Sequence, residues 1–447
     1  MKYFFETYGC QMNTAESAAL QSVLQERGWS QAPDGNAADL VVINTCSVRA
    51  TAEKRVMGRL AQYAALKKKQ RFALMVTGCM ASRLGESLKA ESRAVDYVMG
   101  TAAHPLFPRI LEAVEQGRPF LGDTETPAFS FSSSHQEEGQ FRSFVPIMHG
   151  CNNFCSYCIV PYVRGREVSR SPASILEEIR LVAANGVREI TLLGQNVNSY
   201  YWEGAGDPAF PGNMDFPLLL ELIAHEIEQT PIRWVRFLSS HPKDLSSGAI
   251  RVMAEHPAFC RHLHLCVQHG SNAVLSAMNR RYTRERYLEL VAEIREALPG
   301  ITLSTDILVG FPGETDEDLA RTLNLMEEVR FLYAYMYHYN PREGTAAFKL
   351  PGRIDEEVKR KRLSQVIELQ KRHTLELLQA RIGFRETVLI EGISRKNADE
   401  LITRTERDEM VVVPGKPSMI GAFAELTLSS LKGNTFRAKE LCLCPGD

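Results

Sequence analysis

Short apolar runs alternate with amphipathic stretches through the first 118 residues of the chain. The apolar runs have the length of strands, which we expect at residues 2–8, 39–44, 72–77 and 96–99. Helical periodicity between them predicts helices at residues 15–25, 50–66 and 106–115. Such alternation is typical of a parallel sheet with helices on its faces. We therefore predict a Rossmann-like α/β domain over residues 1–118.

A second alternating pattern follows a stretch rich in Gly, Pro, Ser and Thr, and we assign residues 119–140 to a linker. Beyond it, strands are expected at residues 144–148, 189–193, 233–238, 262–266, 302–309 and 334–338. Helices are expected between them at residues 175–185, 218–227, 286–297 and 316–329. Six such units predict a partial (β/α)6 barrel over residues 141–378, with its active face at the carboxyl ends of the strands.

The pattern changes again after a long charged helix expected at residues 355–380. Short β-like runs at residues 386–391, 410–413 and 423–428 are separated by turn residues. We expect a small β-barrel over residues 379–445, a shape often used to hold nucleic acid. The whole chain is thus predicted to be an α/β protein with three domains.

Composition is that of an ordinary folded protein, since 44% of the 447 residues are hydrophobic and 24% are charged. No apolar run has the length of a bilayer span, and the first residues lack a secretion signal. We therefore expect no membrane partner and a cytoplasmic location, where cysteines are more often metal ligands or catalytic groups than disulfides. With a net charge of −2, nucleic acid would have to be bound by local basic patches.

Cys10, Cys46 and Cys79 each follow one of the first three predicted strands. The carboxyl ends of parallel strands meet at one edge of a sheet, which is where ligands bind in open α/β folds. Considered singly, such cysteines are more simply explained as core residues. Their shared placement at strand ends instead favours one common site.

Cys151, Cys155 and Cys158 form a C-x3-C-x2-C run in the loop after the first predicted barrel strand. Three thiolates can hold a [4Fe-4S] cluster and leave one iron without a protein ligand. That iron can bind the amino and carboxylate groups of S-adenosylmethionine, which is then cleaved homolytically after receiving one electron. A zinc site is the alternative, but no suitably spaced histidine supplies its fourth ligand. Tyr157 stands where an aromatic ring can meet an adenine, although a core or surface tyrosine is the plainer interpretation.

Several segments carry a resemblance to a known family. They are TYGCQMN at residues 7–13, NTC at 44–46, GC at 78–79, CNNFCSYCIVPY at 151–162 with RGRE at 164–167, LGQNVN at 193–198 and GFPGET at 310–315. In this order they resemble the landmarks of the methylthiotransferase family of radical S-adenosylmethionine enzymes. The sequences of these segments are most similar to those of the branch of the family that modifies tRNA.

The resemblance implies two [4Fe-4S] clusters, an auxiliary one on the three strand-end cysteines and a radical one on the C-x3-C-x2-C run. It implies that the C-terminal β domain is a TRAM domain. The implied substrate is the isopentenylated adenosine beside the anticodon, in the anticodon stem-loop of certain tRNAs. Two molecules of S-adenosylmethionine are then used per turnover: one methylates sulfur at the auxiliary cluster, and one yields the radical that attacks C2 of the base.

Two further loops follow predicted strands and are expected to contact S-adenosylmethionine. Together with Tyr157, the residues expected to bind this cofactor are Gly194, Gln195, Asn196, Asn198, Gly310, Phe311 and Pro312. Amides of the first loop can reach the methionine part, and the backbone of the second can pass close to the adenosine. Each loop can also be read as an ordinary turn, the second as a turn that starts a helix.

Phosphate binding needs local positive charge. Arg164 and Arg166 flank the tight cysteine run and are the expected tRNA contacts, with basic runs at residues 67–71 and 359–362 as further candidates. We also expect an electron donor protein such as flavodoxin or ferredoxin, and a monomeric state. No side chain is assigned as catalytic, because the clusters and S-adenosylmethionine carry the chemistry.

Two other functions stay open. A sister methylthiotransferase would act on threonylcarbamoyladenosine or on an aspartate of a ribosomal protein, and a redox-sensing iron-sulfur protein would bind RNA without turnover. Residues 266–271 read CVQHGS where the family commonly has PLQSGS, and residues 340–345 read NPREGT where SxRPGT is more usual. These departures concern substrate contacts and leave both cysteine sets intact.

Overall fold

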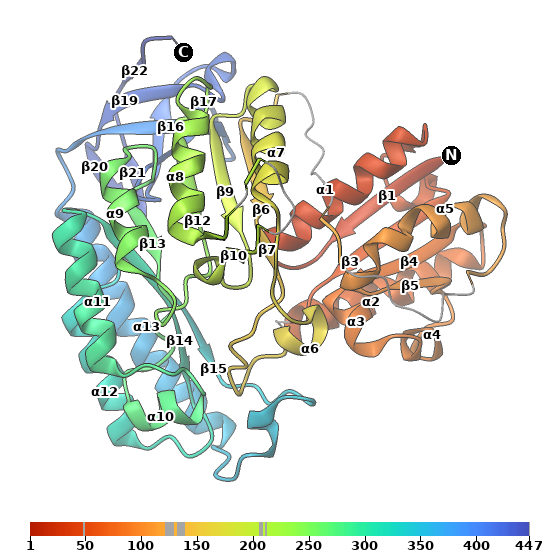
Figure 1. Ribbon diagram of the computed structural model, residues 1–447, viewed down its shortest axis with the longest axis horizontal. Coiled ribbons are helices and arrows are strands. Elements are labelled where there is room, and N and C mark those ends of the chain that lie inside the picture. The colour runs from red at the N-terminus through yellow and green to blue at the C-terminus, as the bar shows by residue number, and fades with distance from the viewer. Residues whose placement is uncertain (48–49, 121–128, 132–138, 205–208, 211, 447) are drawn as a thin grey trace.

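The computed structural model describes residues 1–47, 50–120, 129–131, 139–204, 209–210 and 212–446. Most of the predicted linker, residues 119–140, therefore lies outside the described residues. Figure 1 shows the N-terminal region on one side of a central barrel and the C-terminal strands on the other. Within the described part of the chain, no helix is long and apolar enough to cross a membrane.

The N-terminal region is a parallel sheet, as predicted, with five strands in the order β2-β1-β3-β4-β5, of which β2 was not among the four predicted strands. The strands are β1 (Lys2–Thr7), β2 (Ser30–Gln31), β3 (Leu40–Thr45), β4 (Ala73–Gly78) and β5 (Tyr97–Met99). The helices are α1 (Gln11–Glu26), α2 (Ala50–Lys67), α3 (Cys79–Leu84), α4 (Ser87–Glu91) and α5 (Phe107–Glu115).

The central strand β3 is buried on both faces, which is why its sequence is a continuous apolar run. Leu40 and Val42 belong to a core shared with α1 and α5. Val41 and Ile43, which alternate with them, belong to a second core shared with α2 and α3. The region is a three-layer sandwich, with helices on both faces of the sheet.

The middle region contains two parallel sheets, β6-β9-β12 and β13-β14-β15. Its barrel strands are β6 (Arg142–Pro146), β9 (Glu189–Leu193), β12 (Trp234–Phe237), β13 (His262–His264), β14 (Thr302–Val309) and β15 (Tyr333–His338). Isolated parallel bridges, Val235 to Phe259 and Ser240 to Leu265, join the two sheets. Six parallel strands therefore follow one another around a partial barrel, as predicted.

Helices cover the outside of this barrel (Figure 1). They are α7 (Pro172–Ala184), α8 (Phe216–Ile227), α9 (Ser247–Glu255), α11 (Arg284–Ala297), α12 (Asp316–Val329) and α13 (Glu356–Gln379), with the short α10 (Asn272–Ala277) preceding α11. Helix α9 was not among the predicted helices. It buries Ile250 and Met253 against the barrel core, and so completes the unit between β12 and β13. Two short strands, β10 (Tyr201–Trp202) and β11 (Met214–Asp215), pair beside α8.

The C-terminal region is a seven-stranded sheet in the order β20-β21-β18-β17-β16-β19-β22. Its strands are β16 (Arg385–Ser394), β17 (Asn397–Thr405), β18 (Met410–Pro414), β19 (Phe423–Thr427), β20 (Ser430–Lys432), β21 (Thr435–Arg437) and β22 (Leu441–Leu443). All pairs are antiparallel except β18 with β21. The predicted change to an all-β region is confirmed.

Candidate active site between two cysteine sets

Cys10, Cys46 and Cys79 lie just beyond the carboxyl ends of β1, β3 and β4, which are neighbours in the sheet. Thr7 at the end of β1 pairs with Asn44 near the end of β3, so these strands finish at the same level. Cys46 and Cys79 are buried, whereas Cys10 is exposed at the N-terminus of α1. The fold thus brings three cysteines that are distant in sequence to one edge.

Two buried asparagines hold the loops that carry these cysteines. Asn13 donates from Nδ2 to Asn44 Oδ1 at 2.9 Å and to the Thr45 carbonyl at 3.1 Å. Asn44 donates back to the Asn13 carbonyl at 3.0 Å, and Asn13 Oδ1 accepts from the Cys10 amide at 3.3 Å. A side chain at Gly78 would collide with the Thr45 carbonyl, so β3 and β4 approach as closely as glycine allows.

The C-x3-C-x2-C run occupies the loop between β7 (Met148–His149) and α6 (Val160–Arg164). Strand β7 pairs with β8 (Val168–Ser169), so a short hairpin closes the base of the loop. The Cys151 amide donates to the Gly165 carbonyl at 3.2 Å, and the Cys158 amide donates to the Cys155 carbonyl at 2.9 Å. These bonds turn the backbone so that the three cysteines lie close together.

Burial disfavours the thiolate forms of two cysteines of this loop, Cys151 and Cys158. Burial raises the pKa of Cys151 to about 11 and that of Cys158 to about 12, and Cys155 lies close enough to add to both shifts. A site that disfavours isolated thiolates but gathers three sulfurs suits a metal cluster that takes the place of the protons. This donor set fits a [4Fe-4S] cluster with one iron open to another ligand.

Arg280 is a buried cation beside the same loop. One terminal nitrogen donates to the Cys155 sulfur at 3.4 Å, and the other donates to the Cys266 carbonyl at 2.5 Å. Its Nε donates to the Tyr282 hydroxyl at 3.1 Å, which fixes the plane of the guanidinium. Arg280 therefore links the Cys155 sulfur to the loop that carries Cys266.

Arg164 connects the two cysteine sets. Its buried guanidinium donates to the two carboxylate oxygens of Glu16 in α1, at 2.5 and 3.2 Å. The Cys79 side chain packs against Ile159 and Val163, which follow the tight run. Helix α6 therefore lies against α3, as Figure 1 also shows, and places the two sets on facing parts of the molecule.

This burial corrects the expectation that Arg164 binds a phosphate, because its guanidinium is enclosed and paired with Glu16. Arg166 is exposed, and its guanidinium carbon lies 4.4 Å from the centre of the Phe154 ring. Tyr162, which is 55% exposed, meets the same ring edge-on with 6.0 Å between ring centres. Arg166, Phe154 and Tyr162 thus form a cation-aromatic group on the cysteine loop.

The first expected cofactor loop lies against the cysteine run. Gln195 accepts from the Gly150 amide at 2.6 Å, directly before Cys151. Asn196 donates to Asp244 Oδ2 at 2.7 Å, and Asn153 within the run donates to the same oxygen at 3.3 Å. The structure therefore brings this loop and the tight cysteine run together.

Buried polar atoms without partners mark the carboxyl ends of β9 and β12. Neither amide atom of Asn198 has a hydrogen-bond partner among the described residues, and the same holds for Ser240 Oγ and His241 Nε2. Such orphaned groups are rare and costly in proteins, and they suit a polar ligand. Gly194 lies beside them, where a Cβ would collide with the Met148 side chain.

The second expected loop is a tightly packed turn. Phe311 is fully buried, and its amide donates to Glu314 Oε2 at 3.1 Å. Gly310 has a φ of +72°, and a Cβ there would collide with the buried Lys359 side chain. Pro312 is buried as well. These contacts are those of a turn that starts α12, and the burial of Lys359 argues against the basic run at residues 359–362 as a phosphate patch.

Tyr157 connects this turn with the cysteine loop. Its partly buried ring packs against a small core that contains Phe311 and Met278. Burial raises the pKa of Tyr157 well above its ordinary value, so the hydroxyl stays protonated. The structure therefore brings Tyr157 and Phe311 together, although they are far apart in sequence.

A cavity of about 200 Å³ lies between the N-terminal region and the barrel. Its lining consists of Glu53, Arg83, Ile159, Asn340, Pro341, Arg342 and Glu343. Burial lowers the pKa of Arg342, and the carboxylate of Glu53 opposes that shift. The lining residue Ile159 follows Cys158 and packs against Cys79, so the cavity lies where the two cysteine sets meet.

Four polar residues of the site were not predicted from the sequence: Ser240, His241, Asp244 and Arg280. The first three follow β12, so the reasoning applied to Asn196, a polar residue after a strand, would have found them. Arg280 follows α10, and no local pattern indicates that it reaches Cys155.

Three protein families match successive parts of the chain. Residues 2–100 match the Uncharacterized protein family UPF0004, residues 145–326 match the Radical SAM superfamily, and residues 379–440 match the TRAM domain. Among solved structures, the fold is similar to that of TsrM from Kitasatospora setae, a radical S-adenosylmethionine methyltransferase with cobalamin and a [4Fe-4S] cluster bound. The TM-score is 0.59 at 16% identity, covering 78% of this chain and 74% of that one.

Closer relatives match along nearly the whole chain, and all three named here are called tRNA-2-methylthio-N(6)-dimethylallyladenosine synthase. The protein of Treponema denticola is 49% identical, covering 98% of this chain and 99% of the relative. Those of Geotalea uraniireducens and Bacteroides fragilis are 44% and 43% identical, and each covers 98% of this chain and at least 96% of the relative. The chain therefore belongs to the tRNA-2-methylthio-N(6)-dimethylallyladenosine synthase family of radical S-adenosylmethionine enzymes.

Proposed function

We propose that this protein adds a methylthio group to C2 of N6-isopentenyladenosine beside the anticodon of tRNA. The observation that carries the proposal is the juxtaposition of two cysteine sets, each at the carboxyl edge of a parallel sheet and joined through α3 and α6. The names of full-length relatives at 49% identity support the same substrate.

Each cysteine set is proposed to hold one [4Fe-4S] cluster. The auxiliary ligands are Cys10, Cys46 and Cys79, and the radical-site ligands are Cys151, Cys155 and Cys158. When bound, the two clusters and S-adenosylmethionine supply the methylated sulfur and the 5′-deoxyadenosyl radical that the reaction consumes. Cys46, Cys79 and Cys155 are buried, and exclusion of water from these parts of the sites protects reactive species from side reactions.

The chain's own residues bind and orient the cofactor. Asn198, Ser240 and His241 offer unpaired polar atoms for the methionine end of S-adenosylmethionine. Burial lowers the pKa of His241 to about 2, so its imidazole stays neutral and can donate or accept a hydrogen bond. Asp244 holds Asn196 and Asn153 in place, and thereby fixes the cysteine run against the cofactor loop.

Recognition of tRNA is proposed to begin at Arg166, Phe154 and Tyr162. A guanidinium suits a backbone phosphate, and exposed aromatic rings suit bases that have left the stack of an anticodon loop. The adenine would then enter the cavity between the two cysteine sets, where Arg83 and Arg342 provide positive charge. The TRAM region supports tRNA binding from the other side of the barrel.

The remaining assignments are proposals of the same kind. We propose a monomer located in the cytoplasm and reduced by flavodoxin or ferredoxin, since the radical chemistry needs an electron donor. Domain limits are proposed at residues 1–118, 141–378 and 379–445, with a linker at 119–140. The matched family regions fall within these limits.

The test is mass spectrometry of nucleosides from total tRNA of a source strain that lacks this gene. We expect isopentenyladenosine to accumulate and its 2-methylthio form to disappear, and both to recover when the wild-type gene returns. An unchanged pair would refute the substrate. Loss of a methylthio group from threonylcarbamoyladenosine or from a ribosomal protein would instead identify one of the sister enzymes.

A further inference from the structure

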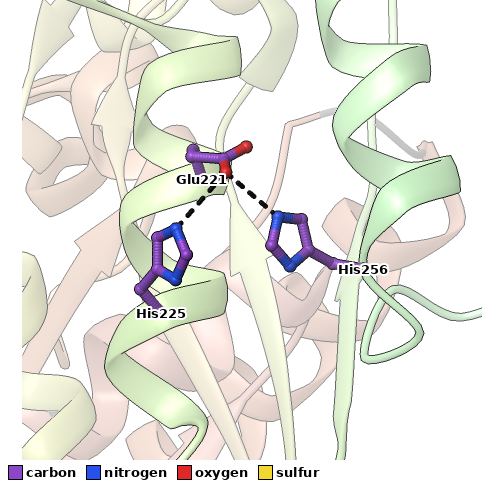
Figure 2. Close-up of side chains that lie close together, drawn as sticks. All are labelled: Glu221, His225 and His256. Atoms are coloured by element: carbon purple, nitrogen blue, oxygen red, sulfur yellow. Dashed lines mark hydrogen bonds and ion pairs between the residues drawn. The ribbon is translucent and has the colours of Figure 1, made fainter.

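A second cluster of potential metal ligands lies on the outer helices of the barrel. Glu221 and His225 belong to α8, and His256 directly follows α9. Figure 2 shows both imidazoles directed at the Glu221 carboxylate from two different helices. One ligand atom of each residue lies within 4.8 Å of the other two.

The distances match the edges of a small coordination polyhedron. His256 Nε2 lies 3.1 Å and His225 Nε2 lies 3.3 Å from the same oxygen, Glu221 Oε1. In tetrahedral zinc sites the metal-ligand bonds are about 2.0–2.2 Å, which places neighbouring ligand atoms about 3.3 Å apart. Small shifts of these partly or fully exposed side chains are therefore sufficient to centre an ion among the three atoms.

The contacts of the two ring nitrogens of His225 also favour an ion. Its Nδ1 lies 3.1 Å from Glu228 Oε1, while its Nε2 faces Glu221. A neutral imidazole carries one N–H and can donate to only one of these carboxylates. If Nδ1 donates to Glu228, the lone pair of Nε2 points toward Glu221, which is the arrangement that metal-binding histidines have with a supporting carboxylate.

The local structure positions all three ligands. Glu221 and His225 are four residues apart and so lie on one face of α8. His256 ends α9 in an extended conformation, and its amide donates to the Val252 carbonyl at 3.1 Å. The His256 ring meets Phe259 edge-on, with 6.4 Å between ring centres. Both helices pack on the barrel core, which limits how far the ligands can separate.

We propose that Glu221, His225 and His256 bind a divalent transition-metal ion of the zinc class. Two imidazoles and one carboxylate match the ligand preference of Zn²⁺, and they leave a fourth position for water. The ion links α8 to α9 on the outside of the barrel. This site contains no cysteine and is separate from both proposed cluster sites.

The test uses the full chain with both clusters loaded, under anaerobic conditions, titrated with zinc chloride by calorimetry and examined at the zinc X-ray absorption edge. We expect one equivalent of zinc with only nitrogen and oxygen neighbours at about 2.0–2.2 Å. Zinc with sulfur neighbours at about 2.3 Å, or no saturable binding, would overturn the proposal. Iron and sulfide contents measured before and after titration show whether zinc has displaced a cluster.

Two variants test whether zinc binds at these three residues and not elsewhere. We expect His256→Gln to weaken zinc binding more than tenfold, because one of three ligands is lost. Glu255→Gln, an exposed neighbour on α9, should bind zinc as the wild type does. Equal affinity of His256→Gln and wild type would refute the site even where zinc binds elsewhere. The readouts are affinity and coordination, so the methylthiotransferase proposal can fail without affecting them.

Discussion

Cys151 and Cys158 carry protons that a cluster must displace. Burial raises their thiol pKa values from 9.0 to about 11 and about 12, so both are protonated at neutral pH. Because iron replaces these protons, lower pH favours the metal-free form and higher pH favours loading. In a variant with Cys10, Cys46 and Cys79 changed to alanine, we expect more cluster per chain after reconstitution at pH 8.5 than at pH 7. Equal iron and sulfide contents at the two pH values would contradict this.

The Glu16–Arg164 pair joins α1 of the N-terminal region to the segment that follows the tight cysteine run. Both side chains are buried, with exposures of 7% and 3%, so removal of one charge leaves the other uncompensated. We expect Glu16→Gln to destabilise the protein by about 3 kcal/mol. Glu26→Gln, at an exposed position of the same helix, should change stability by less than about 0.5 kcal/mol. Thermal unfolding of the two variants compares them directly, and equal melting temperatures would exclude a structural role for the pair.

Some features of the site could be predicted from the sequence, and others could not. The convergence of Cys10, Cys46 and Cys79 could be predicted, because strand order and strand ends follow from local patterns. The burial of Arg164 could not, because it depends on Glu16, which is 148 positions away. Arg280 was missed for the same reason, since its contact with Cys155 spans 125 positions.

At the scale of elements, the turn between β14 and α12 offers a matched pair of glycines. Gly310 and Gly313 have φ values of +72° and +80°, but only Gly310 is closely approached by another side chain, that of Lys359. We expect Gly313→Ala to cost about 1 kcal/mol through its backbone conformation. Gly310→Ala should cost about 2 kcal/mol more, because Lys359 is buried and cannot move aside freely. Urea unfolding measures both, and similar costs would mean that Lys359 yields to the added methyl group.

Helices and strands with a clear pattern of hydrophobic residues were easier to predict than short ones. Strand β14 was predicted at its observed bounds, because six of its eight residues are buried and the run is long enough to be distinct in the sequence. Helix α9 was missed because its nine residues begin with Ser247 and Gly248, which have low helix propensity. Its packing on the barrel core, rather than its propensity, stabilises it.

At the scale of the whole molecule, Glu189 joins the barrel to the TRAM region. This buried carboxylate of β9 pairs with Arg142 at 3.0 Å, Arg236 at 3.0 Å and Arg404 of β17 at 2.8 Å. Arg236 also donates to the carbonyls of Thr405 and Glu406, so one cluster of charges spans both regions.

We expect Glu189→Gln to loosen this junction, because the buried Arg236 would lose its carboxylate partner, whereas Arg142 and Arg404 would keep their pairs with Glu391. Limited proteolysis should release a fragment near residue 380 from the variant faster than from the wild type. The exposed Glu255→Gln variant serves as the control and should be cleaved at the wild-type rate. Unchanged cleavage of Glu189→Gln would show that apolar packing alone holds the two regions together.

The two cysteine sets are expected to perform separate parts of one reaction. To test this directly, purified enzyme with both clusters loaded is incubated with S-adenosylmethionine, a chemical reductant and tRNA that contains isopentenyladenosine. Mass spectrometry then identifies the products. We predict the 2-methylthio nucleoside from the wild type. A Cys79→Ala variant should still release 5′-deoxyadenosine but leave the nucleoside unmodified. Methylthio transfer by Cys79→Ala, or its absence with the fully loaded wild type, would contradict the account.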